Sequence, residues 1–203
     1  MSDLLVAVVH DVKNQLAELA LRLERRGDAQ QEMALALNAA RRLSEMLLVH
    51  REQNGQLSVN QDSVDPSDFL DILAAEYREL FPHREIGVDN SQAPPFAFFD
   101  DGLVRMALAN ALHNACRHAS RRVMLRSYSQ DGQLVLEVAD DGEGFSSHQL
   151  GAPGEAPAGV SERGTGMGLY LARRIAELHQ LDGRHGSIVL LNQNGGVFRM
   201  LLP

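Results

Sequence analysis

The stretch SERGTGMGLYLARRIAE, Ser161 to Glu177, decides the fold of the second half of this chain. Three glycines, Gly164, Gly166 and Gly168, alternate with other residues and lead directly into apolar residues with the period of an amphipathic helix. The pattern predicts a glycine-rich turn that opens a helix. Converging backbone N–H groups and the positive end of the helix dipole suit an anion such as a phosphate. The alternative is a flexible loop before an ordinary helix, since short glycine motifs also match by chance.

The composition is that of a soluble globular protein with one or two domains. The chain has 203 residues, of which 44% are hydrophobic and 23% charged. A net charge of -8 and a pI near 5.4 argue against a nucleic-acid-binding protein that neutralises backbone phosphates. The single cysteine, Cys116, excludes an internal disulfide and a cysteine-based metal cluster, which fits a reducing compartment.

No segment has the pattern of a membrane span or a secretory signal. The longest purely apolar run, Leu4 to Val9, has six residues, whereas a span needs roughly 20. The run stops at His10 and Asp11 without the small-residue pattern of a cleavage site. We therefore expect a soluble, cytoplasmic protein with no membrane insertion.

Heptad spacing predicts two helices near the N-terminus, joined by a short turn. Arg25, Arg26 and Gly27 end the first helix, and Asp28 with Gln31 resembles a capping box for the second. Because the turn is short, the two helices should form an antiparallel hairpin. The first seam comprises Leu5, Val9, Val12, Leu16, Leu19 and Leu23, and the second comprises Met33, Ala36, Ala40, Leu43, Leu47 and His50.

A hairpin of two helices cannot cover its own apolar stripes. Pairing with a second copy into a four-helix bundle is the stable solution, so we expect a homodimer. The alternative is packing of the hairpin onto the second half of the same chain.

His10 lies at the border of the first apolar stripe, a place where a histidine is more often structural than catalytic. Its neighbours favour chemistry: Asn14 stands one turn along the same face and can present an amide to whatever His10 carries. Asp11 can accept the Nδ1 proton, which leaves Nε2 free to attack an electrophile. Residues at i and i+1 do not face each other on a helix, so this contact requires favourable rotamers of both side chains.

The polar run from Gln53 to Gln56 interrupts the heptads and marks the domain boundary. We assign residues 1–54 to the helical domain and residues 57–203 to a second domain. In the second domain we expect a short strand at Leu57 and Val59, a helix from Pro66 to Leu80 entered through Asp65 or Ser67, a strand from Ile86 to Val88 and a short buried strand from Phe96 to Phe99.

The next helix, expected from Gly102 to Ala119, carries unusual polar residues. Asn110 and Asn114 lie at i and i+4 on one face, although asparagine is a mediocre helix former. A carboxamide oxygen can ligate Mg²⁺, and Arg117 can meet a phosphate on the next turn. A polar solvated face is the alternative.

A hairpin is expected from Val123 to Ser129 and from Leu134 to Val138, and its second strand leads to DDGEGF at residues 140–145. Asp140 can accept a hydrogen bond from an adenine amino group, although an exposed acidic turn is equally compatible. Residues 146–163 lack periodicity and are expected to form a lid. A last hairpin from Ser187 to Leu202 completes an α+β fold, an α/β sandwich of helices and mostly antiparallel strands.

Four segments in this order resemble the motif set of sensor histidine kinases, whose ATP-binding domain belongs to the superfamily of gyrase, Hsp90 and MutL. HDVKNQL at residues 10–16 is similar to the phosphoacceptor box and NALHNACRHA at residues 110–119 to the asparagine box. DDGEGF and GTGMGL, residues 164–169, are similar to the two glycine boxes. The resemblance implies a dimerisation and phosphotransfer domain followed by a catalytic ATP-binding domain.

The resemblance also implies roles for individual residues in transfer of a phosphoryl group from Mg-ATP to the protein. His10 matches the phosphorylated histidine, Asp11 the acidic general base, and Asn14 the residue that orients water during dephosphorylation of a partner. The positions that match nucleotide-binding residues are Asn110, Asn114 (also the Mg²⁺ ligand), Arg117, His118, Asp140, Gly142, Gly144, Gly164, Thr165, Gly166, Met167, Gly168 and Leu169.

The sequence departs from the family pattern in three places. Gln15 stands where many members have proline, no phenylalanine-centred box is recognisable in the lid, and only nine residues precede His10. We therefore expect the signal to come from a separate sensor or input protein, unless the chain begins inside a larger one. The expected partner downstream is the receiver domain of a response regulator, with no nucleic acid involved.

Three alternative functions remain open at this stage. The chain can be a histidine phosphotransfer adaptor with a degenerate ATP domain, or a response-regulator phosphatase with little autokinase activity. An anti-sigma type of serine kinase shares the ATP-binding fold but has no helical hairpin with a histidine box. The signal, the response regulator and the choice between transfer within or between subunits do not follow from the sequence.

Overall fold

The computed structural model describes residues 30–151, 153–154 and 167–203, together with Val9, Val12, residues 14–16 and 18–19, and Leu23. The chain forms two compact units, residues 1–57 and 58–203. In the part of the chain that the structure describes, no helix combines the length and the hydropathy of a transmembrane span.

The first unit contains helix α2, Gln30–Gln53. The few described residues before it are also helical, but most of the expected first helix, including His10 and Asp11, lies outside the described residues. The helical hairpin and its dimer therefore stay predictions. Ala36, a seam residue, is buried, and so is Leu48, which lies outside the expected seam.

Helix α2 ends at the polar run that the sequence marks as a break. Gly55 has a φ of +65°. Its N–H donates to the carbonyl of Glu52 at 2.9 Å, and the N–H of Gln56 donates to the carbonyl of Arg51 at 2.8 Å. These two bonds form a Schellman motif, for which glycine is the preferred residue because the left-handed conformation disfavours a side chain.

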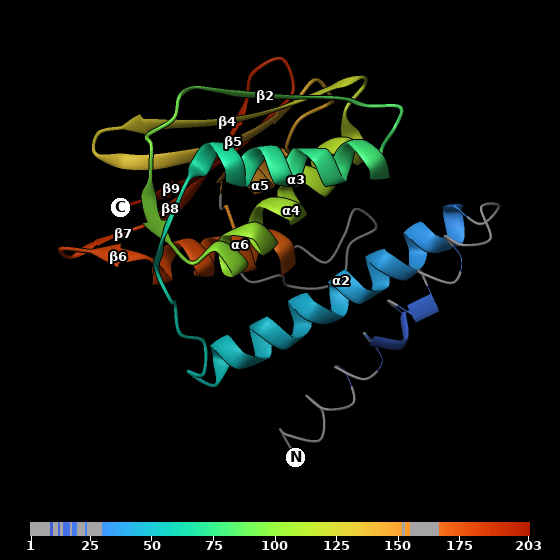
Figure 1. Cartoon of the computed structure of the whole chain (residues 1–203), viewed down its shortest axis with the longest axis horizontal. Helices are drawn as coiled ribbons and strands as arrows, with labels where there is room; N and C mark the ends of the chain where they lie inside the picture. Colours follow the sequence, from blue (N-terminus) through green and yellow to red (C-terminus); the bar gives the residue numbers. More distant parts are fainter. Residues whose placement is uncertain are drawn as a thin grey trace. The chain divides into compact units, whose positions relative to one another are not determined.

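The second unit is built on a five-stranded mixed sheet with three helices on one face (Figure 1). The strand order is β2-β4-β5-β9-β8; β2 pairs with β4 in parallel and the other neighbours pair antiparallel. This arrangement confirms the expected α+β class. The strands are β2 Glu85–Gln92, β4 Arg122–Gln130, β5 Gln133–Asp140, β8 Ser187–Asn192 and β9 Gly196–Leu202, and the helices are α3 Pro66–Leu80, α4 Asp101–His118 and α6 Met167–Leu178.

Alternation along the strands directs one apolar face of the sheet toward the helices. The core between the layers therefore consists of every second strand residue and the apolar stripes of the helices. Fully buried members include Leu73 of α3, Leu108 and Leu112 of α4, Leu125 of β4, Leu136 of β5, Leu171 and Ile175 of α6, and Met200 of β9.

Local sequence signals place the starts of two of these helices. The Asp65 side chain accepts from the N–H groups of Ser67 at 2.8 Å and Asp68 at 3.3 Å, and Pro66 occupies the first turn of α3. This geometry confirms Asp65 as the entry residue. Asp100 caps α4 in the same way through the N–H of Leu103, because both aspartates offer an oxygen to otherwise unpaired helical N–H groups.

Helix α6 packs antiparallel along the first half of α4 and is fixed at both ends. At the start of α6, a Cβ on Gly168 would lie 1.6 Å from Asn110 Nδ2, so the missing side chain lets the helices approach closely. Beyond the end of α6, the buried His179 accepts from the N–H of Asp100 through Nε2 at 3.0 Å. The two contacts aim the N-terminus of α6 at the middle of α4.

Two expectations for the start of this unit are wrong. Leu57 and Val59 are not in a strand; the first strand is β1, Asp62–Val64, which pairs with β3, Ala97–Phe99. Of the expected buried strand only Phe99 is buried, whereas Phe96 and Phe98 are 57% and 58% exposed. A ribbon of two strands has one face open to solvent, which accounts for the alternation.

Two short elements lie where the sequence analysis expected none. A hairpin of β6, Gln180–Leu181, and β7, Arg184–His185, follows α6, and its turn residues Asp182 and Gly183 have φ of 50° and 76°. The expected lid is not devoid of regular structure, because it contains α5, Ser147–Gly151. Residues 155–166 of the lid region and glycine turn lie outside the described residues.

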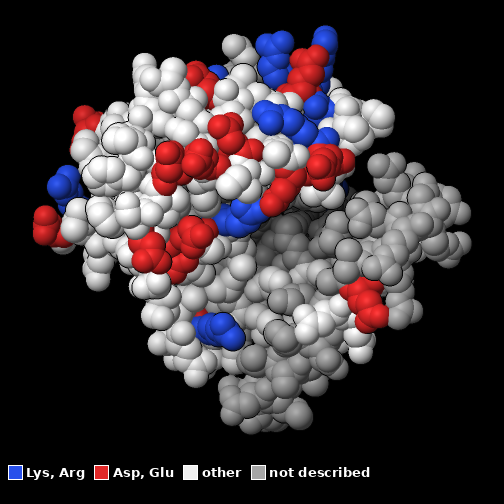
Figure 2. Space-filling model, viewed as in Figure 1, with Lys and Arg blue, Asp and Glu red and all other residues white. Residues whose placement is uncertain are grey.

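The described surface is mixed in charge. Figure 2 shows acidic side chains spread over the visible face near α3. The exposed acidic positions of that helix are Asp68, Asp71, Glu76 and Glu79. The described part of this face offers no continuous cationic patch for a polyanion.

Candidate nucleotide-binding site

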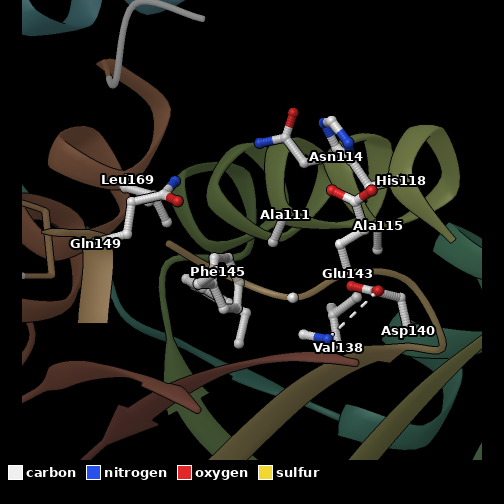
Figure 3. Close-up of a pocket in the computed structure, with 13 residues that line it drawn as sticks. Ala111, Asn114, Ala115, His118, Val138, Asp140, Glu143, Phe145, Gln149 and Leu169 are labelled. Atoms are coloured by element: carbon white, nitrogen blue, oxygen red, sulfur yellow. Dashed lines mark hydrogen bonds between the residues drawn. The ribbon is translucent and has the colours of Figure 1, made fainter. Parts of the chain in front are cut away.

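A pocket of about 340 Å³ opens between the second half of α4, the end of β5 and the turn that follows it (Figure 3). Helix α5, the first residues of α6 and strand β9 complete its wall. The lining residues are Ala111, Asn114, Ala115, His118, Val138, Asp140, Glu143, Gly144, Phe145, Gln149, Leu169, Gly196 and Phe198.

Helix α4 presents one stripe to this pocket. Ala111, Asn114, Ala115 and His118 are spaced by three and four residues, so they share a helix face. The two alanines leave space for a ligand. Asn114 and His118 are exposed, and their side chains make no hydrogen bond to another described residue. Their polar atoms are therefore available to a ligand.

Two successive aspartates at the end of β5 have different tasks. Asp140 faces the pocket, and its Oδ1 accepts from the N–H of Gly142 at 2.8 Å and of Gly196 at 3.4 Å. Those bonds fix the carboxylate and leave Oδ2 for a donor on a ligand. Asp141 instead accepts from the N–H groups of Arg121 and Arg122 at 2.9 and 3.0 Å. The backbone N–H of Arg121 is the main cause that lowers the pKa of Asp141.

Glycines bring the turn after Asp140 close to its surroundings. A Cβ on Gly142 would lie 2.3 Å from the backbone oxygen of His118 at the end of α4. Gly144 has a φ of +79°, and a Cβ there would lie 2.5 Å from Asn192 Oδ1. Neither position can hold a side chain without movement of the wall of the pocket.

Asn192, at the end of β8, holds this turn and was missed by the sequence analysis. Its Oδ1 accepts from the N–H of Phe145 at 2.8 Å, and its Nδ2 donates to the carbonyl of Phe145 at 2.9 Å. The pair of bonds keeps the Phe145 ring at the pocket wall. Asparagine at a strand end is common, so the sequence carries no local signal for this long-range contact.

Some of the predicted nucleotide-binding residues lie away from the pocket. Asn110 is 6% exposed and lies against Gly168, so the structure places it in the contact between α4 and α6 rather than on the pocket wall. Arg117 is exposed on the neighbouring face of α4 and does not line the pocket. Leu169 lines it and Met167 begins α6, whereas Gly164, Thr165 and Gly166 lie outside the described residues.

Other pocket residues were not among the predicted site residues. Glu143 and Phe145 belong to the DDGEGF motif, so their position beside Asp140 was a usable signal. Val138 and Phe198 are inward residues of β5 and β9. Gln149 comes from α5, in the segment that was expected to be irregular.

Cys116 is buried and does not line the pocket. The residue is 1% exposed, and burial raises the pKa of its thiol to about 12. A protonated, inaccessible thiol is neither a nucleophile nor a metal ligand. Within the described residues no three histidine, cysteine or acidic side chains are grouped to hold a metal ion.

The fold and the pocket agree with the comparison to protein families. Residues 99–203 match the histidine kinase-, DNA gyrase B-, and HSP90-like ATPases. This chain belongs to that ATPase family.

Among curated proteins, the relatives include bacterial sensor kinases. The sensor histidine kinase GtrS of Pseudomonas aeruginosa is 29% identical over 209 residues, which cover 98% of this chain and 41% of GtrS. The alginate biosynthesis sensor protein KinB of the same species is 27% identical, over 79% of this chain and 28% of KinB. The chain thus spans less than half the length of these relatives. The predicted relationship to sensor histidine kinases is confirmed.

Solved structures show the same fold. The structure of full-length ShkA in complex with AMPPNP superposes with a TM-score of 0.73 at 20% identity, and covers all of this chain and 46% of ShkA. The Acinetobacter baumannii histidine kinase AdeS superposes with a TM-score of 0.64 at 15% identity, over 93% of this chain and 95% of AdeS.

Proposed function

We propose that this chain is the kinase core of a sensor histidine kinase: it binds Mg-ATP in the pocket beside α4, phosphorylates His10 and passes the phosphoryl group to an aspartate of a response regulator. The observation that carries the proposal is the pocket itself. Asp140 and Asn114 face one cavity in a chain of the histidine kinase-like ATPase family.

In this proposal different residues of the pocket bind different parts of the nucleotide. Asp140 Oδ2 accepts a hydrogen bond from the adenine amino group, since Oδ1 already accepts hydrogen bonds from two backbone N–H groups. Phe145 and Val138 supply apolar surface for the base. Arg117 and His118 match the family positions that contact the phosphates. Because His118 lies nearer to Asp140 than to Gln149 (Figure 3), it would meet the phosphate next to the nucleoside.

Asn114 suits a magnesium ion as one ligand among several. Mg²⁺ usually binds one or two protein oxygens and completes its octahedral shell with water and substrate phosphates. An exposed carboxamide without a described partner meets that requirement, and a cluster of carboxylates is unnecessary. The ion would neutralise charge on the phosphate chain during transfer.

The chemical step transfers a phosphoryl group to an imidazole nitrogen. His10 Nε2 attacks the γ-phosphorus, the bond from this phosphorus to its bridging oxygen breaks, and ADP leaves with the electron pair. Asp11 accepts the proton from Nδ1, so that the phosphorylated imidazole is neutral. A receiver aspartate then attacks the same phosphorus and releases His10. Rate enhancement comes from positioning and charge neutralisation.

The homodimer is part of the same proposal. Val12 and Leu19, two residues of the predicted heptad seam, are 40% and 46% exposed in the single chain. Pairing with a second copy would remove these side chains from water.

A response-regulator phosphatase is the second candidate function. Asn14 and Gln15 are helical and exposed, so they lie on the surface at which a partner would dock. In that case ATP binds but His10 is never labelled.

Labelling with γ-³²P ATP and Mg²⁺ tests the proposal. The wild-type chain should acquire an acid-labile, base-stable phosphate, and His10→Ala should acquire none. Unchanged labelling of His10→Ala would contradict the assignment of His10. No ATP affinity at all would favour the phosphotransfer adaptor instead.

Asn114→Ala tests the magnesium role. Because Asn114 is exposed and has no described partner, its thermal unfolding should match that of the wild type within about 0.5 kcal/mol. Labelling should fall at least a hundredfold, since positioning and charge neutralisation dominate phosphoryl transfer. Full labelling of this variant at limiting Mg²⁺ would refute the metal role, and size-exclusion chromatography should show an unchanged oligomeric state.

A further inference from the structure

Helix α5 begins with a reciprocal pair of hydrogen bonds. The backbone N–H and the hydroxyl of Ser146 both donate to Gln149 Oε1, at 3.0 and 2.9 Å. The N–H of Gln149 in turn lies 3.4 Å from Ser146 Oγ. Serine followed three residues later by glutamine is a capping box, which fixes the first turn of a helix.

These bonds determine which end of the Gln149 amide faces the pocket. A backbone N–H can only donate, so the amide atom that meets the N–H of Ser146 must be the oxygen. The Nε2 group is therefore the free end, and it makes no hydrogen bond to any other described residue. Gln149 lines the pocket. The capping box thus presents an N–H donor to the cavity.

The position of Gln149 indicates which part of a ligand it meets. Figure 3 shows Gln149 beside Leu169 at one end of the pocket, with Asp140 at the opposite end. Leu169 lies in the first turn of α6, where helical N–H groups favour an anion. If Asp140 binds the base, the phosphate chain extends toward Gln149.

A second contact holds this end of the lid segment in place. Gly154 has a φ of +68°, and a Cβ there would lie 2.7 Å from the carbonyl oxygen of Leu169 and 2.8 Å from Cβ of Arg173. The turn after α5 is therefore seated on α6. Gln149 is fixed between the DDGEGF turn before it and this contact after it.

We propose that Gln149 Nε2 donates a hydrogen bond to the phosphate chain of the bound nucleotide and thereby makes α5 a nucleotide-binding element of the lid. The inference rests on the proposed function, in which the pocket binds ATP. It assigns a binding role to a residue outside the asparagine and glycine motifs.

The variant Gln149→Glu separates the donor from the cap. Glutamate serves at this position of a capping box as well as glutamine does, so α5 should stay intact, but the pocket receives an acceptor and a negative charge. The neutral variant Gln149→Met removes the donor without adding charge, but it also removes the capping acceptor Oε1, so its effect counts only together with that of Gln149→Glu. His148→Glu is the matched control, because it places the same charge on an exposed neighbour that does not line the pocket.

Calorimetric titration of the full chain with Mg-ATP, Mg-ADP and adenosine is the test. Gln149→Met and Gln149→Glu should each raise Kd for both phosphorylated nucleotides about ten- to a hundredfold, the usual loss for a hydrogen bond to a charged group. Adenosine should bind as to the wild type. His148→Glu should change no Kd more than about threefold. The ligand-free unfolding temperature of Gln149→Glu should equal that of the wild type.

Three results would overturn the inference. Wild-type affinity of Gln149→Met for ATP would show that the donor is not used, and equal weakening of adenosine would place the contact on the nucleoside. If His148→Glu raised Kd for ATP and ADP as much as Gln149→Glu does, long-range charge repulsion would account for the effect of Gln149→Glu. Failure of the wild-type chain to bind any nucleotide is a different result, since it refutes the proposed function and this inference together.

Discussion

Single side chains at the pocket show how strongly one atom can constrain the site. The backbone oxygen of His118 occupies the space where Gly142 would carry a Cβ, at 2.3 Å. Unlike the end of a flexible side chain, this oxygen belongs to the last turn of α4 and cannot move without the helix. Gly142 has no positive φ, so its backbone conformation does not require a glycine. The requirement comes from the close approach of the turn to the end of α4.

Gly142→Ala should therefore lower both stability and nucleotide affinity. Forcing a methyl group into a filled space costs about 1 to 3 kcal/mol of unfolding free energy, and the displaced turn moves Asp140 away from its position. Urea unfolding and ATP titration measure the two effects. Gly151→Ala is the control, because a Cβ there meets nothing within 4 Å. Equal behaviour of the two variants would contradict the steric argument.

At the scale of elements, the sequence predicted what depends on neighbours in the chain. Asp65 followed by Pro66 is enough to start α3, and the alternation on both sides of Asp131 and Gly132 is enough to predict β4 and β5. These signals act within a few residues. The common site of Asp140 and Asn114 came instead from the resemblance to sensor histidine kinases, and both residues line the pocket.

Local sequence signals did not predict the contacts between segments that are distant in sequence. Spacing puts Asn110 and Asn114 on one helix face, but it does not reveal that α6 covers Asn110. Strand β1 forms at Asp62–Val64 rather than at Leu57 because its partner is β3, more than thirty residues away in sequence. Periodicity measures a segment alone, and tertiary pairing overrides it.

The link from β8 to the DDGEGF turn is a testable case of such a distant contact. Asn192→Ala removes both hydrogen bonds to Phe145 and should lower the unfolding free energy by about 1 to 2 kcal/mol. Nucleotide affinity should fall severalfold, because the turn between Asp140 and Phe145 is released. Parallel urea unfolding and ATP titration provide the measurement. Gln193→Ala, at an exposed neighbouring position, should change neither the unfolding free energy nor the nucleotide affinity. A normal affinity of Asn192→Ala would show that the turn keeps its conformation without Asn192.

At the scale of the whole second unit, hydrogen bonds of one buried histidine and of Asp100 connect the segment before β1 with α4 and α6. Asp100 accepts from the N–H of Asn60 at 2.9 Å and caps α4, while its own N–H donates to His179 Nε2. His179 Nδ1 donates to the carbonyl of Ile175 at 2.7 Å. Since Nε2 accepts and Nδ1 donates, the ring is neutral. A proton on Nε2 would face another N–H group and break the link.

This arrangement predicts that the second unit loses stability as pH falls below about 6.5, the ordinary value for histidine. Burial lowers the pKa of His179, against smaller raising effects of Ile175 and Asp100. Between the lowered folded pKa and 6.5 the unfolded chain binds more protons than the folded one, so stability rises with pH there, by up to about 1.4 kcal/mol per pH unit. Carboxylates with lowered pKa, such as Asp141 and Glu177, titrate at more acidic pH. They therefore do not contribute to the change in stability between the lowered pKa of His179 and pH 6.5.

His179→Gln provides the comparison, because a glutamine amide can accept from Asp100 and donate to Ile175 at every pH. Urea unfolding followed by tyrosine fluorescence reports on this unit alone, since all three tyrosines, Tyr77, Tyr128 and Tyr170, lie in it. The unfolding free energy of the wild type minus that of the variant should rise from pH 5.5 to 7 and then level off. A difference that is constant with pH would mean that His179 titrates alike in the folded and unfolded chain, and would exclude the neutral, doubly bonded ring as the source of the pH dependence.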